Sequence, residues 1–184
     1  MVMLKGSDKI ANVSADGKLR RKTAPPAGAS QPFHIDPEMK ELIESGVAVL
    51  VATGDAERRP HVTYGWGPRV RDDGTTVDVF LDRERSAETL RNAKANAHIA
   101  MTVAHPVSYR SAQFKGCFID AGDPTDEDEA WVRRHREAFV VSTSLVGDPP
   151  GVVSGFWMDD VVRVTFRVER AYNQTPGPDA GKPL

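Results

Sequence analysis

The stretch TVDVFLDRERSAETLRNAKAN, residues 76–96, decides how the chain folds. It begins with alternating valine and leucine, which give one apolar face to a strand that ends at Asp82. Ser86 then opens a segment without glycine or proline, which predicts a helix with Ser86 as its cap. Arg83 and Arg85 therefore precede a helix N-terminus, where unpaired backbone N–H groups attract anions. The pattern suits either a capped helix among solvated charges or a cradle for a phosphate group.

Further strands and helices are predicted on both sides of this stretch. The additional strands cover residues 47–54, 60–70, 97–106, 108–122 and 161–172, and the additional helices cover residues 37–45 and 125–142. The short turns DAERR at 55–59 and RDDGT at 71–75 allow only antiparallel neighbours. The fold class that follows is mainly β with flanking helices, a small closed or nearly closed barrel of about six antiparallel strands.

The chain divides into one domain and two irregular ends. Its 184 residues, 40% of them hydrophobic and 27% charged, fit a single globular domain. Residues 1–33 are polar and broken by Gly, Ala and Pro, so they predict an extended or partly disordered arm. The folded domain is expected to span residues 34–172. Residues 173–184 form a Pro/Gly-rich tail that is not expected to adopt regular structure.

Charge and composition argue against several classes of function. A net charge of −2 argues against nucleic acid as a partner, and no apolar run approaches the length of a membrane span. The N-terminus lacks the apolar core of a secretory signal, and the single cysteine, Cys117, suits a reducing cytoplasm. We therefore expect a cytoplasmic protein. The five histidines show no metal-binding spacing, so no metal site is expected.

Two features of the sequence can each be interpreted in two ways. Trp66 between Gly65 and Gly67 either fills the core or a subunit interface, or marks a place where a ligand approaches the backbone closely. Gln113 and Lys115 lie on one face of a strand whose other face is largely apolar, so they meet either a polar partner or solvent.

Three segments, taken in order, resemble the pyridoxamine 5'-phosphate oxidase-like family of FMN-binding split β-barrels. They are GVAVLVATGDAERRPHVT at 46–63, TVDVFLDRERSAETLRNAKANAHIAM at 76–101 and YRSAQFKG at 109–116. The resemblance runs from Ile35 to Tyr172. It implies FMN as the cofactor and a homodimer in which the cofactor lies at the subunit interface.

The resemblance also implies which residues bind the cofactor. They are Thr63, Tyr64, Leu81, Asp82, Arg85, Ser86, Ser111, Gln113 and Lys115. Arg85 and Ser86 stand where the family places an Arg–Lys pair on the phosphate. Ser111 and Gln113 would reach the flavin from the second subunit. Of the two arginines in the turn, Arg83 and Arg85, we expect Arg85 to hold the phosphate.

The expected function is that of an FMN-dependent oxidoreductase acting on an unknown small molecule. The segment AYNQTPGP at 171–178 has no Trp and Arg that match those recognising the vitamin phosphate, so pyridoxamine phosphate is not the expected substrate. No residue is assigned a catalytic role, although His61, Tyr64 and Lys115 are candidates for an acid or base. The sequence leaves open a non-catalytic flavin store, sensor or electron carrier, a deazaflavin-binding protein, and a haem protein with His34, His61 or His105 as axial ligand.

Overall fold

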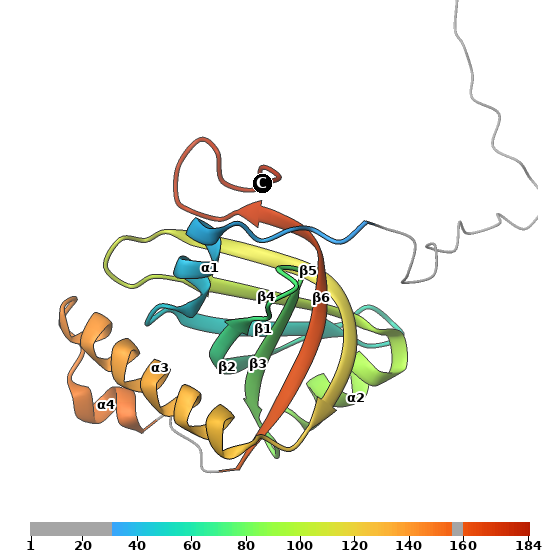
Figure 1. Cartoon of the computed structure of the whole chain (residues 1–184), viewed down its shortest axis with the longest axis horizontal. Helices are drawn as coiled ribbons and strands as arrows, with labels where there is room; N and C mark the ends of the chain where they lie inside the picture. The colour runs from blue at the N-terminus through green and yellow to red at the C-terminus, as the bar shows by residue number, and fades with distance from the viewer. Residues whose placement is uncertain (1–30, 156–159) are drawn as a thin grey trace, which may run out of the picture.

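Six strands close into one antiparallel barrel in the computed structural model, which describes residues 31–155 and 160–184 (Figure 1). The strand order around the barrel is β1-β2-β3-β6-β5-β4. The strands are β1 (Ala48–Gly54), β2 (Pro60–Val70), β3 (Thr76–Asp82), β4 (His98–Ala104), β5 (Ser111–Gly122) and β6 (Val161–Asn173). The expected fold class is therefore confirmed, and the barrel is closed.

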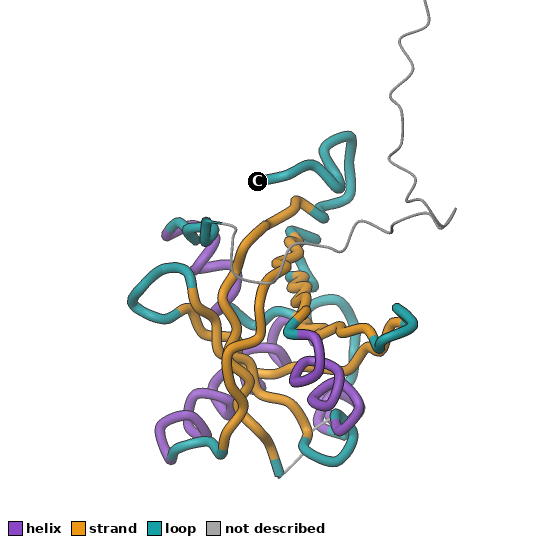
Figure 2. Tube along the Cα trace, turned by 90° about the vertical axis from the view of Figure 1, so that its right-hand side faces the viewer, coloured by secondary structure: helices purple, strands orange, loops and turns teal. Residues whose placement is uncertain are grey.

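The described residues form four helices around the barrel. They are α1 (Pro37–Glu44), α2 (Ala87–Asn96), α3 (Asp126–Ser144) and α4 (Pro150–Ser154), of which the short α4 was not predicted. Asp36 caps α1 by accepting the Met39 N–H at 2.8 Å, and Thr125 opens α3 with a capping box. In both views α1 lies near one end of the barrel and α2 near the other (Figure 1, Figure 2).

The two ends of the domain lie along β6. Residues 1–30 of the predicted arm are outside the described part of the chain. Phe33, which follows them, donates its backbone N–H to the Val168 carbonyl at 2.9 Å. Beyond Asn173, where β6 ends, the C-terminal tail is irregular apart from an isolated bridge between Tyr172 and Pro183.

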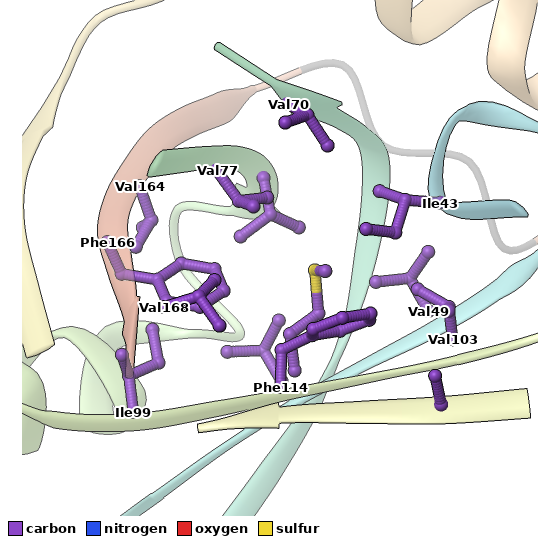
Figure 3. Close-up of a cluster of buried hydrophobic side chains, with 14 of the residues drawn as sticks. Ile43, Val49, Val70, Val77, Ile99, Val103, Phe114, Val164, Phe166 and Val168 are labelled. Carbon is purple, nitrogen blue, oxygen red and sulfur yellow. The ribbon is translucent and has the colours of Figure 1, made fainter. Parts of the chain in front are cut away.

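Alternating side chains of the strands fill the barrel interior (Figure 3). Phe114 and Phe166 are among the largest side chains with no exposed surface. Each such side chain stabilises the fold by about 1.5–3 kcal/mol relative to an exposed one. A Cβ atom at Gly65 would lie 2.8 Å from Val79 and 2.9 Å from Val49. Glycine at position 65 is therefore explained by the packing of the interior.

Helix α3 covers the outer face of the barrel where β2, β3 and β6 run side by side. Trp66, Phe80 and Val161 pack there against Val132 of the helix. Trp131 of α3 donates its indole N–H to the carbonyl of Gly67 at 3.0 Å. Trp66 therefore belongs to a second apolar cluster between helix and barrel, in agreement with the first of its two interpretations.

A buried ionic network attaches the start of α3 to the barrel. Arg69 bonds to the carboxylates of Asp78 and Asp128, and Arg163 donates to Asp128 at 3.2 Å. Burial by itself raises the pKa of Asp128, but hydrogen bonds from Thr125 and Arg69 outweigh it and hold this pKa below its ordinary value. The ionised Asp128 therefore both caps α3 and anchors it.

Another part of the outer face stays exposed. Leu50, Val62 and Tyr64 on β1 and β2 have exposed fractions of 41%, 54% and 56%. The cross-strand register pairs Leu50 with Tyr64 and sets Val62 opposite Ala52. Neighbouring apolar side chains in this position give the barrel an exposed apolar patch, which we define as Leu50, Val62 and Tyr64.

Candidate functional site

The turn between β3 and α2 holds the residues predicted to bind a phosphate. The Asp82 carboxylate accepts a hydrogen bond from the backbone N–H of Arg85, and the Asp82 carbonyl accepts the Ser86 N–H at 3.0 Å. The side chain of Ser86 makes no capping bond, so Asp82 organises the turn instead of the serine that was expected to do so. Arg85 lies just before the first turn of α2.

The two arginines of this turn have different surroundings. The Arg83 guanidinium donates to Asp160 at 2.9 Å and to Asp123 at 2.7 Å, and these bonds raise the pKa of Arg83. The Arg85 side chain is exposed and forms no salt bridge with any described residue. Of the two, Arg85 has the guanidinium that is available to an anion.

Two side-chain contacts join the start of α2 to β2. Thr63 Oγ1 lies 3.0 Å from Ser86 Oγ, and His61 Nδ1 lies 2.8 Å from Thr89 Oγ1. Ser86 and Thr89 have no exposed surface, whereas Thr63 is half-buried. The structure thus brings together four of the predicted residues, Thr63, Asp82, Arg85 and Ser86. The Ser86 hydroxyl is already paired with that of Thr63.

The other predicted residues of β2 and β3 face different sides. Tyr64 is exposed on the outer face, whereas Thr63 next to it faces α2, because successive side chains on a strand alternate. Leu81 is fully buried in the barrel interior, so its side chain contacts the core. Asp82 at the end of β3 is half-buried and bonded to the turn.

Gln113 and Lys115 also point outward, but from β5, which lies three strands from β2 in either direction around the closed barrel. Gln113 donates to Thr102 Oγ1 at 3.2 Å, and Lys115 Nζ lies 5.1 Å from the centroid of the Tyr172 ring. Both side chains therefore have polar or aromatic neighbours within the sheet. They therefore project from the opposite side of the barrel to Tyr64. Within one chain they form a group separate from Arg85.

Ser111 lies at the other end of the barrel, in a cleft of about 220 Å³ that the sequence did not predict. The cleft lies between α1, the start of β5 and the C-terminal tail, with Met39, Arg110 and Leu184 among its lining residues. Arg110 pairs there with Glu38 at 2.8 Å. The structure therefore does not bring Ser111 and Arg85 together within one chain.

The three histidines considered as haem ligands lie in different parts of the fold. His34 lies against Gly74 in the turn between β2 and β3, and His61 contacts α2. His105 accepts the Ser108 N–H at 3.2 Å in the turn after β4. Residues 31–155 and 160–184 contain no group of three His, Cys, Asp or Glu side chains that could hold a metal ion. Within the same ranges, no helix combines the length and apolar character needed to cross a bilayer.

The residues around Arg85 fit the phosphate end of FMN. Arg85 contributes a guanidinium, and α2 contributes the N–H groups and positive partial charge of its first turn. Asp82 and Glu84 bring negative charge close to this position, but the Asp82 carboxylate is occupied by the backbone N–H of Arg85. The arrangement can therefore hold a phosphate or another small anion.

No family model matches the chain, and no curated protein matches it. Among solved structures, HupZ of Group A Streptococcus is 22% identical, with a TM-score of 0.50 over 80% of this chain and 99% of HupZ. An F420 reductase is 22% identical, with a TM-score of 0.48 over 74% of this chain and 98% of the reductase. A Clostridium acetobutylicum protein of the pyridoxinephosphate oxidase family is 17% identical, with a TM-score of 0.45 over 76% of this chain and 87% of the Clostridium protein. The chain therefore has the fold that its resemblance to the pyridoxamine 5'-phosphate oxidase-like family predicted, a barrel of six antiparallel strands with flanking helices.

Proposed function

We propose that the protein binds FMN and acts as an oxidoreductase on a small molecule. The observation that carries the proposal is the exposed Arg85 guanidinium at the N-terminus of α2, which forms no salt bridge with any described residue. A phosphate at this position gains charge-assisted hydrogen bonds from Arg85 and from the first turn of the helix. Arg83 is less available to a phosphate, because Asp123 and Asp160 already pair with it.

The chemistry of the reaction comes from FMN, which supplies hydride or electron transfer when bound. The residues of the chain orient the bound cofactor. Arg85 fixes the phosphate end, and Tyr64 offers an aromatic ring and a hydroxyl on the adjoining outer face. His61, Tyr64 and Lys115 remain the candidates for moving a proton. We place the protein in the cytoplasm, in keeping with the free thiol of Cys117.

We further propose that a homodimer completes the site. The exposed apolar patch loses contact with water when a second copy packs on it, which favours association. Gln113 and Lys115 lie too far from Arg85 within one chain, but a two-fold related copy can bring its own pair across the interface. Light scattering of the purified protein tests this proposal. A mass of one chain at micromolar concentration would contradict it.

The identity of the cofactor is tested by the absorbance spectrum and mass of the compound released from the denatured protein. We expect a flavin spectrum and the mass of FMN. A Soret band would indicate haem instead of FMN. A mass equal to that of a deazaflavin would indicate that the cofactor is a deazaflavin. Absence of any bound flavin, even after incubation with excess FMN, would reject the proposal. Reduction of the bound flavin by NADH or NADPH and its reoxidation by a defined acceptor distinguish an enzyme from a flavin store.

Arg85→Ala tests the phosphate role directly. A hydrogen bond to a charged group contributes roughly 1.5–3 kcal/mol, so we expect the FMN dissociation constant to rise about tenfold or more. The affinity for riboflavin, which lacks the phosphate, should not change. Arg91→Ala is the matched control, because it removes the same charge from α2 at a residue that pairs with Glu88 at 3.6 Å. Unchanged FMN affinity in Arg85→Ala would refute the role.

A further inference from the structure

Helix α2 is attached to the barrel by a row of polar side chains. Ser86, which precedes α2, and three residues on one side of α2 contact β1 or β2 at helical spacing, and we call these contacts the polar ladder. They join Ser86 Oγ to Thr63 Oγ1 at 3.0 Å, Thr89 Oγ1 to His61 Nδ1 at 2.8 Å, Asn92 Nδ2 to Thr53 Oγ1 at 3.5 Å, and Asn96 Nδ2 to the Gly54 carbonyl at 2.7 Å. Leu90 and Ala93 of α2 also face the barrel, so the polar ladder adds to an apolar contact and requires an explanation of its own.

The polar ladder is buried and spans two strands. Ser86 and Thr89 have no exposed surface, and Asn92 is 6% exposed. Thr53 of β1 and His61 of β2 are cross-strand partners, so the ladder attaches α2 to both strands. A buried polar group that loses its partner is costly, whereas apolar surfaces tolerate a small slide. The polar ladder therefore permits one position of α2 on the barrel and opposes its displacement.

We infer that the polar ladder positions the anion site at the N-terminus of α2, with Thr89 and His61 as positioning residues. The inference rests on the proposed function, since Arg85 is the group that is positioned. Thr89 lies one helical turn after Arg85, so its bond to His61 holds the turn that carries the N–H groups of the site. A site held in place before binding loses less free energy to ordering when the ligand arrives.

The test compares FMN and riboflavin affinities in the full chain with valine or serine at position 89. Thr89→Val keeps the shape of the side chain but leaves His61 Nδ1 without its partner, whereas Thr89→Ser keeps the hydroxyl. We expect Thr89→Val to weaken FMN binding about tenfold, the equivalent of one buried hydrogen bond, and to leave riboflavin binding unchanged. Thr89→Ser should restore FMN binding. Amide hydrogen exchange in the first turn of α2 should rise in Thr89→Val without flavin.

Two controls separate positioning from a general loss of structure. Asn96→Ala removes the ladder contact at the far end of α2, and the ratio of FMN to riboflavin affinity should stay that of the wild type. His61→Ala removes the central contact from the strand side, so it should reproduce the FMN-specific loss even if Thr89→Val does not fold.

The outcomes also separate this inference from the proposed function. The positioning role would be overturned if Thr89→Val or His61→Ala weakened the binding of FMN and riboflavin equally, or weakened neither. A wild-type protein that does not prefer FMN to riboflavin would overturn the phosphate site itself. An FMN preference that persists in both variants but disappears in Arg85→Ala would overturn the positioning role and leave the proposed function intact.

Discussion

Acidification should weaken the fold through one buried histidine of α3, His135. Its side chain packs edge-on against Trp66 with ring centroids 6.2 Å apart, and neither ring nitrogen forms a hydrogen bond of normal geometry with a described residue. Burial is the main reason why the pKa of His135 is lowered from 6.5 to about 4. An interaction with the Val47 backbone raises this pKa, and the positive charge of Arg136 lowers it further. The neutral ring is therefore the form that packs between α3 and the barrel.

The sign and size of the effect follow from the two pKa values. The unfolded chain takes up the proton of His135 near pH 6.5, but the folded chain takes it up only near pH 4. The stability that the neutral ring contributes is complete above about pH 6.5 and is lost as the pH falls towards 4. At about pH 4.5 the loss amounts to roughly 2–3 kcal/mol, which is a large part of the stability of an ordinary domain.

Urea denaturation at pH 7.5 and pH 4.5 measures this loss in the wild type and in His135→Leu. Carboxylates respond to acid in both proteins, so the difference between the two losses isolates His135. We expect His135→Leu to lose roughly 2–3 kcal/mol less than the wild type between the two pH values. His98→Leu is the control, because His98 is exposed. Equal losses in the wild type and His135→Leu would refute the assignment of acid sensitivity to this ring.

Two further substitutions test the packing of the barrel. Asp128→Asn leaves the guanidinium groups of Arg69 and Arg163 without their shared carboxylate, so the free energy of unfolding from urea denaturation should fall by about 3 kcal/mol. A fall below about 1 kcal/mol would show that this network does not attach α3. Gly65→Ala places a Cβ against valine side chains of the interior and should cost roughly 1–3 kcal/mol in the same assay. Gly122→Ala, whose nearest neighbour would be 3.7 Å away, should cost much less.

The barrel could be predicted because local patterns determine most of it. Val77 and Val79 alternate with outward residues along β3, and their period of two identifies a strand without knowledge of its neighbours. The turns at 55–59 and 71–75 are too short for anything but antiparallel pairing. The strand expected to begin at residue 108 begins instead at Ser111, because Tyr109 has a φ of 57° and bends the chain.

The details of the candidate site could not be predicted in the same way. The choice between Arg83 and Arg85 depends on Asp123 and Asp160, which are distant in sequence and reach Arg83 only in the folded chain. The polar residues of α2 resemble a solvated helix face, and only the strand residues opposite them show that this face is buried. The helical spacing of Ser86, Thr89 and Asn92 places them on one face, but a search for hydrophobic periodicity does not identify a polar face as buried.

The C-terminal tail affects how the barrel behaves in concentrated solution. Strand β6 extends beyond the end of its ladder with β3 at Arg167, which leaves a stretch of edge after that residue. Leu184 donates its N–H to the Ala171 carbonyl at 3.0 Å, and Asn173 donates to the Lys182 carbonyl at 2.9 Å, so the tail covers this edge. An uncovered strand edge is a template on which a strand of another molecule can add. The tail thus blocks one route by which copies of the chain could aggregate through their sheets.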